Sequence, residues 1–249
     1  MIALVAVLVI LIGRLAFSHD WPGTAPLAQW WRTYRPTLVA FVRASPATFV
    51  YLAILSVTTW VLVGASPTVV SALLQEQSTN LRHLSQDPLR VLIRSAFWLS
   101  GYELLFWAAL FLIVLAPAER WLGTVRWLVA FTAGHVGATV LTASGIWLAI
   151  KSGVAPERLQ NAVDVGVSYG FAAVAALFTY RLPQPWRIAW AAGLITYATG
   201  GIVIDHDFTA YGHAAALVIG FALYPLTRAP AVQTRATQPL LRMAPASSP

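Results

Sequence analysis

Two residues far apart in the chain, Ser168 and His213, are of the types that carry out nucleophilic catalysis. Each is expected about one helical turn inside a strongly apolar segment, Ser168 in Gly166-Val-Ser-Tyr-Gly170 and His213 in Tyr211-Gly-His-Ala. A serine hydroxyl attacks a carbonyl carbon when a base within hydrogen-bond reach accepts its proton. Because ionisable residues inside a membrane are costly and usually functional, the two residues are predicted to form a Ser–His dyad at one depth of a helical bundle.

The composition indicates a membrane protein. Of 249 residues, 58% are hydrophobic and 10% are charged, which leaves too little polar surface to cover a soluble globule of this size. The absence of cysteine excludes disulfides and thiol chemistry. The net charge is +7, but the arginines are scattered among the loops, so no nucleic-acid partner is expected. Lys151 is the only lysine, and this arginine bias is typical of a GC-rich bacterium.

The elements that must position the dyad are membrane-spanning helices. At about 20 apolar residues per span, the sequence predicts an all-α polytopic protein. Residues 1–17 lack the positive n-region and the cleavage site of a secretory signal, so they are predicted to remain as a helix. The seven predicted spans lie near 1–17, 45–65, 99–116, 125–149, 164–180, 187–204 and 210–227.

The distribution of arginine predicts the orientation of these spans. One side of the membrane collects most of the basic residues, among them Arg120, Arg181 and Arg228, and is therefore predicted to be cytoplasmic. The protein is then a multi-pass protein of the bacterial plasma (inner) membrane with a cytoplasmic C-terminus. The helices that carry Ser168 and His213 both begin at the outer face of the membrane, and each of the two residues lies roughly 6 Å below that face.

Three regions are predicted along the chain. Residues 1–44 comprise the N-terminal transmembrane helix and a cytoplasmic interfacial linker, and residues 45–228 form the membrane domain. Residues 229–249 are rich in Pro, Ala, Thr, Ser and Arg and are predicted to be a disordered cytoplasmic tail. Within 67–98, the longest polar stretch, residues 88–98 are predicted to form a helix at the outer interface.

Other polar residues have simpler interpretations. His135 falls roughly 10 Å deeper than the dyad, so a buried hydrogen-bonding role is favoured over catalysis. Asp164, one turn before Ser168, is interpreted as a helix N-cap in preference to a residue that orients the site. The loop at Asp205, His206 and Asp207 lacks a fourth ligand, so no metal site is predicted. Serines and histidines in membrane helices also serve packing, and the shared depth is what favours a dyad.

Over about residues 88–228, the order of motifs resembles the rhomboid intramembrane serine proteases and their inactive relatives. The serine motif reads Gly166-Val-Ser-Tyr169, and His213 is followed by the small residues Ala216 and Gly220. Glu119-Arg-Trp-Leu-Gly123 is similar to the Glu-x-Arg-x-Gly region of that family. Further matches are Arg90, Arg181, Ser78-Thr-Asn-Leu81 and Asp164-Val-Gly-Val-Ser-Tyr169, of which the last two are similar to an actinobacterial rhomboid-like branch.

The sequence departs from the family at the oxyanion site. The family's His-x-x-x-Asn pair falls on Glu103 and Trp107, and the glycine after the serine is Tyr169. The aromatic residue that often follows four residues after the serine is replaced by Ala172. Three groups are candidate replacements for the lost donors: the indole N–H of Trp107, the Ser168 amide near a helix N-terminus and a protonated Glu103.

The resemblance implies a rhomboid-like six-helix core preceded by one additional N-terminal transmembrane helix. It also implies an intramembrane serine endopeptidase that acts on transmembrane substrates, with Ser168 as nucleophile, His213 as base and Glu103, Trp107, Gly166, Tyr169 and Asp164 as accessory residues. No cofactor is expected. The alternative is an inactive pseudoprotease that binds or escorts transmembrane client proteins. A transporter is disfavoured, because the sequence contains no inverted repeat.

Overall fold

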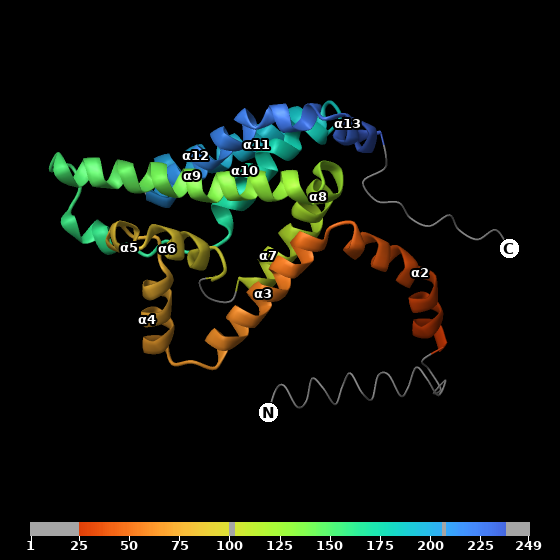
Figure 1. Cartoon of the computed structure of the whole chain (residues 1–249), viewed down its shortest axis with the longest axis horizontal. Coiled ribbons are helices and arrows are strands. Elements are labelled where there is room, and N and C mark those ends of the chain that lie inside the picture. The colour runs from red at the N-terminus through yellow and green to blue at the C-terminus, as the bar shows by residue number, and fades with distance from the viewer. Residues whose placement is uncertain (1–24, 100–102, 206–207, 238–249) are drawn as a thin grey trace. The chain divides into compact units, whose positions relative to one another are not determined.

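The computed structural model describes residues 25–99, 103–205 and 208–237, and within these ranges the chain is helical without a strand (Figure 1). The predicted helix at 1–17 lies outside the described residues. The chain divides into two compact units, 1–43 with 241–249, and 44–240. The first unit contains α2 (Ala25–Arg43), in which Trp30 and Trp31 are exposed beside arginines, as a helix at a membrane interface requires.

The second unit is a helical bundle that begins with α3. Among its described residues, five helical stretches are long and apolar enough to cross a membrane, whereas α10 is shorter and buried among them. The bundle helices are α3 (Pro46–Val63), α7 (Leu104–Leu110), α8 (Ala116–Leu122), α9 (Thr124–Lys151), α10 (Ser168–Phe178), α11 (Trp186–Gly200) and α12 (Phe208–Ala222). The π-helical turns η1 (Phe111–Leu115) and η4 (Gly201–Asp205) join α7 to α8 and extend α11.

Three short helices connect α3 to α7: α4 (Pro67–Gln77), α5 (Leu81–Gln86) and α6 (Pro88–Ser95). Each begins after a residue whose side chain accepts a backbone N–H of the first turn, namely Ser66, Asn80 and Asp87. Helix α6 lies where the sequence predicted an interfacial helix. The 3₁₀ turns are η2 (Glu157–Asn161), η3 (Thr179–Arg181) and η5 (Tyr224–Arg228).

Helix α10 is the centre of the bundle and packs against both α9 and α12. Its residues from Ala172 to Phe178 are buried, and most of them are small. An 11-residue helix is about 16 Å long, roughly half the thickness of the hydrocarbon core. A short helix can therefore begin below the end of the bundle, and its first residue, Ser168, is half-buried.

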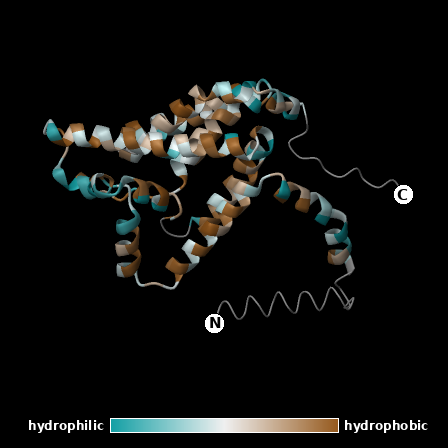
Figure 2. Ribbon diagram, viewed as in Figure 1, coloured by the Kyte–Doolittle hydropathy of each residue, from teal (hydrophilic) through white to brown (hydrophobic). Residues whose placement is uncertain are grey.

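The outer surface of the bundle is apolar. Figure 2 shows hydrophobic residues along the bundle helices and hydrophilic residues around α5 and the end of α9. Large side chains such as Leu105, Ile204 and Val218 are 83%, 79% and 67% exposed. The exposure of large apolar side chains on several helices is expected of a surface that contacts a lipid bilayer.

A buried carboxylate joins the start of α3 to the corner between α8 and α9. Glu119 is fully buried and accepts hydrogen bonds from the Thr48 amide at 2.8 Å and the Thr48 hydroxyl at 2.7 Å. The Ala47 amide at 3.0 Å and the Thr124 hydroxyl at 2.7 Å also donate hydrogen bonds to this carboxylate. The carboxylate thus satisfies amides that the first turn of α3 cannot pair within the helix.

The structure differs from the sequence prediction at the C-terminal side of the bundle. Residues 229–249 were predicted to be a disordered tail, but α13 (Pro230–Ala236) forms there and packs on α8. Val232, at its centre, is fully buried. Ala229 and Ala236 also pack against the core, and the polar composition of the segment gave no indication of these contacts. Residues 238–249 lie outside the described part of the chain.

Candidate active site

Ser168 is the first residue of α10, and the segment before it is not helical. The sequence predicted a helix from 164 with Ser168 one turn inside, and this boundary is wrong. The reason is that the backbone before Ser168 bonds to other segments, since the Gly166 amide donates to the carbonyl of Ser95 at the end of α6 at 2.9 Å. Gly166 has a φ of 124°, a region that favours glycine, and it turns the chain into α10.

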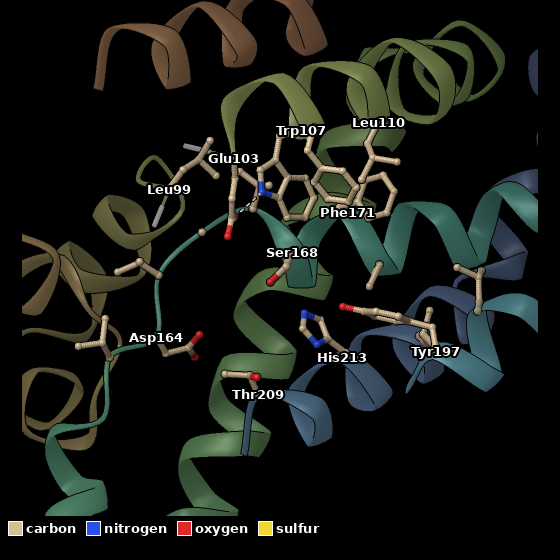
Figure 3. Close-up of a pocket in the computed structure, with 18 residues that line it drawn as sticks. Leu99, Glu103, Trp107, Leu110, Asp164, Ser168, Phe171, Tyr197, Thr209 and His213 are labelled. Atoms are coloured by element: carbon tan, nitrogen blue, oxygen red, sulfur yellow. Dashed lines mark hydrogen bonds between the residues drawn. The ribbon is translucent and has the colours of Figure 1, made fainter. Parts of the chain in front are cut away.

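Ser168 and His213 line one cavity of about 720 Å³ at the end of the bundle where α10 begins. In Figure 3 the side chains of Ser168 and His213 lie near each other in this cavity. The predicted accessory residues Glu103, Trp107, Asp164 and Gly166 line the same cavity. Tyr169 does not line it but is buried behind His213.

Two tyrosine rings hold the His213 imidazole. The ring of Tyr169 meets it edge-on with centroids 5.2 Å apart, and the ring of Tyr197 lies at 5.7 Å. In Figure 3 the hydroxyl end of Tyr197 is directed toward His213. Sequence reasoning missed Tyr197, because nothing in its spacing along α11 connects it with α12. The two tyrosine rings therefore flank His213. In the sequence comparison, the family's aromatic residue beside the histidine is replaced by Ala172.

Close packing of α10 on α12 sets the spacing between the two helices. A Cβ added at Gly212 would overlap the Tyr169 ring, and one added at Gly220 would overlap the Ala173 carbonyl. Ala216, midway between these glycines, is fully buried. Small residues at the crossing let the backbones approach closely, as membrane helices commonly do.

The model of the rhomboid-like protein family matches residues 40–233. The chain belongs to the rhomboid-like family. No curated protein and no solved structure matched it in the same comparisons. The match includes the whole bundle from α3 to α12, and therefore both residues of the candidate dyad.

In this rhomboid-like chain Glu103 and Trp107, the two residues at the predicted oxyanion site, are bonded to each other. The Trp107 indole N–H donates to Glu103 Oε2 at 3.1 Å, and the Trp107 ring packs edge-on against Phe171. The indole is therefore engaged by a carboxylate, which argues against it as an oxyanion donor.

Asp164 of the rhomboid-like chain does not cap α10. The N-cap position belongs to Val167, which has no side-chain cap. The Asp164 carboxylate instead accepts a hydrogen bond from the Thr79 hydroxyl at 3.1 Å and lines the cavity. The N-cap interpretation failed because the helix begins one turn later than predicted.

His135 is buried and hydrogen-bonded, as the sequence predicted. Its Nε2 lies 2.9 Å from the Leu92 carbonyl oxygen and 3.4 Å from Ser95 Oγ, and the residue does not line the cavity. His206 and Asp207, in the loop where no metal site was predicted, lie outside the described residues. In the described ranges, no group of three His, Cys, Asp or Glu side chains is placed to hold a metal ion.

Proposed function

We propose that this rhomboid-like protein is an intramembrane serine endopeptidase that cleaves transmembrane substrates with Ser168 and His213. The observation that carries the proposal is the common cavity, which is lined by a serine at the start of a buried helix and by a histidine from a neighbouring helix (Figure 3). The cavity also has room for a short stretch of extended peptide.

In the proposed reaction, Ser168 Oγ attacks the scissile carbonyl carbon while His213 accepts the hydroxyl proton. The resulting oxyanion faces the N-terminus of α10, where the first amides have no partner within the helix and the helix dipole favours negative charge. His213 then protonates the leaving amine, which releases one product and leaves an acyl-enzyme. Water, deprotonated by His213, hydrolyses the ester and restores Ser168.

The position of Ser168 suits a membrane substrate. The residue opens an 11-residue helix inside a bundle of longer, lipid-facing helices. A substrate helix that unwinds at its end can place an extended segment in the cavity from the side of the membrane where α10 begins. The arginine distribution supports assigning that side to the exterior of a bacterial plasma membrane, with the C-terminus in the cytoplasm.

One observation favours a second candidate function, a pseudoprotease that binds or escorts transmembrane clients. Glu103 and Trp107 stand where the family has an oxyanion-binding pair, and a carboxylate repels an oxyanion. Loss of one oxyanion donor lowers turnover roughly 100- to 1000-fold. The same cavity would then hold a client segment without cleaving it.

Cleavage of a reporter separates the two functions. The purified full-length protein is reconstituted with fluorescent single-pass reporter helices of varied sequence, beside the Ser168→Ala variant. The protease proposal predicts fragments with the wild-type protein and none with Ser168→Ala. Co-purification of uncut reporters with both proteins, without fragments from either, would instead support the pseudoprotease.

A further inference from the structure

Two loops about 85 residues apart in sequence are bonded to each other next to the candidate nucleophile. Ser78 Oγ accepts the Asp164 amide at 2.8 Å and donates to the Ala162 carbonyl at 3.2 Å. The Thr79 amide donates to the Asp164 carbonyl at 2.9 Å. Gln75 adds a bond from its side-chain amide to the Asn161 carbonyl at 2.9 Å. These bonds satisfy the backbone polar groups of a segment that is neither helix nor strand.

Thr79 also fixes a side chain. Its hydroxyl lies 3.0 Å from the Asp164 carbonyl oxygen and 3.1 Å from Asp164 Oδ2, so one hydroxyl reaches both the backbone and the carboxylate. Ser78 and Thr79 are 0% and 5% exposed. A buried hydroxyl with so few alternative partners holds its acceptor in a narrow range of positions.

The loop that carries Ser78 and Thr79 is itself fixed at both ends. It connects α4 to α5, and the Ser78 amide donates to the Gln75 carbonyl at 3.3 Å. At the other end, Asn80 Oδ1 accepts the His83 amide at 2.9 Å, and His83 Nδ1 lies 3.2 Å from the Ser78 carbonyl. The loop is therefore a rigid support and not a flexible connection.

Only three residues separate Asp164 from Ser168, and this interval is fixed as well. Gly166 bonds to Ser95, and Val167 is fully buried at the start of α10. The contacts at Asp164, Gly166 and Val167 therefore act together to hold the backbone that leads into Ser168. The Asp164 carboxylate lines the same cavity as His213, so its direction also affects the charge around the imidazole.

We propose that Ser78 and Thr79 are positioning residues for the Ser168–His213 pair. Ser78 fixes the backbone that leads into α10, and Thr79 fixes both that backbone and the Asp164 carboxylate on the cavity wall. This inference rests on the proposed hydrolytic function. Neither hydroxyl touches the reacting atoms. The two hydroxyls act by holding Ser168 and Asp164 in place before the reaction. Misplacement of a reacting group by about 1 Å can lower the reaction rate roughly 100-fold.

The test measures how fast a fluorophosphonate probe labels Ser168 in the full-length protein in detergent. Rates at several probe concentrations give the limiting rate and the half-saturating concentration for Thr79→Val, Thr79→Ser and Ser78→Ala. Ser85→Ala is the matched control, because its exposed hydroxyl bonds locally to the Arg82 carbonyl at 2.7 Å. Thermal unfolding is recorded for each variant.

Thr79→Val and Ser78→Ala are expected to lower the limiting rate at least tenfold, with the half-saturating concentration nearly unchanged. Thr79→Ser restores the rate, because serine retains the hydroxyl, and Ser85→Ala leaves it unchanged. If Thr79→Val does not fold, Ser78→Ala provides the same comparison.

Normal limiting rates for the folded Thr79→Val and Ser78→Ala proteins, with only a lower unfolding temperature, would overturn the positioning role while leaving the proposed function intact. A wild-type protein that is not labelled would overturn the proposed function and the positioning role with it.

Discussion

The ring of Tyr169 meets the imidazole of His213 edge-on, with centroids 5.2 Å apart and the ring planes at 75°. Tyr169 stands where rhomboid proteases have the small residue of their Gly-x-Ser-Gly motif. The ring is accommodated because the neighbour of the histidine on α12 is Gly212. The two positions therefore form a complementary pair: a large residue on α10 requires a small one on α12.

We expect Gly212→Ala to destabilise the protein by about 1–3 kcal/mol, because the new methyl group overlaps a buried aromatic ring. Truncating the ring relieves the overlap, so Tyr169→Gly combined with Gly212→Ala should cost less than the sum of the single changes. The measurement is a double-mutant cycle of unfolding free energies in detergent. Gly193→Ala is the control, because a Cβ there meets nothing within 4 Å. Additive effects would argue against the coupling.

Gly166→Ala is expected to lower the rate of Ser168 labelling by fluorophosphonate. Its φ of 124° is unfavourable for alanine by about 1–3 kcal/mol, and the strain falls two residues before the nucleophile. Gly64→Ala is the matched control, because Gly64 has a φ of −92° and open space around it. Equal labelling rates for the two folded variants would show that the turn at Gly166 does not position Ser168.

Glu103→Gln is expected to raise the labelling rate about tenfold, the change that corresponds to about 1.4 kcal/mol of barrier. A neutral amide no longer repels the oxyanion-like adduct on Ser168. Glu76→Gln, at an exposed position, serves as the control. A slower reaction of Glu103→Gln would mean that Glu103 assists the site.

Trp107→Phe tests the indole separately. Phenylalanine keeps a ring against Phe171 but removes the donor to Glu103. We expect an unchanged or faster labelling rate, because the indole N–H serves the carboxylate and not the oxyanion. A fall of more than tenfold in the folded variant would identify the indole as an oxyanion donor after all.

Glu119→Gln is expected to lower the stability by about 1–3 kcal/mol. The carboxylate accepts from two amides and two hydroxyls, and the amide nitrogen of glutamine cannot accept any of them. Thermal unfolding beside the exposed control Glu76→Gln measures the loss. An unchanged unfolding temperature would mean that the junction of α3 with α8 does not depend on this carboxylate.

The sequence predicted the helical bundle and the closeness of two distant residues for different physical reasons. Long apolar segments predict spans because lipid requires them. Ser168 and His213 could be predicted to lie close together because the helices that carry them enter the membrane from the same side. In the structure both residues line one cavity. The predicted positions of the two residues depend only on the order of the membrane spans and on the distance of each residue from the end of its span.

What sequence reasoning missed depends on contacts between loops and between faces of helices. The start of α10 was predicted one turn too early, because the bonds from Ser78, Thr79 and Ser95 hold residues 162–166 out of the helix. Tyr197 was missed because its contact with His213 depends on the rotation of α11 about its axis. Neither property leaves a periodic pattern in the sequence.

The most direct test of the central claim is the mass of the folded protein after reaction with a fluorophosphonate, followed by peptide mapping. Activation of Ser168 by His213 predicts a single phosphonyl adduct on Ser168, absent from Ser168→Ala and formed at least 100-fold more slowly by His213→Ala. No adduct on Ser168, or an adduct formed at the same rate without the His213 imidazole, would contradict it.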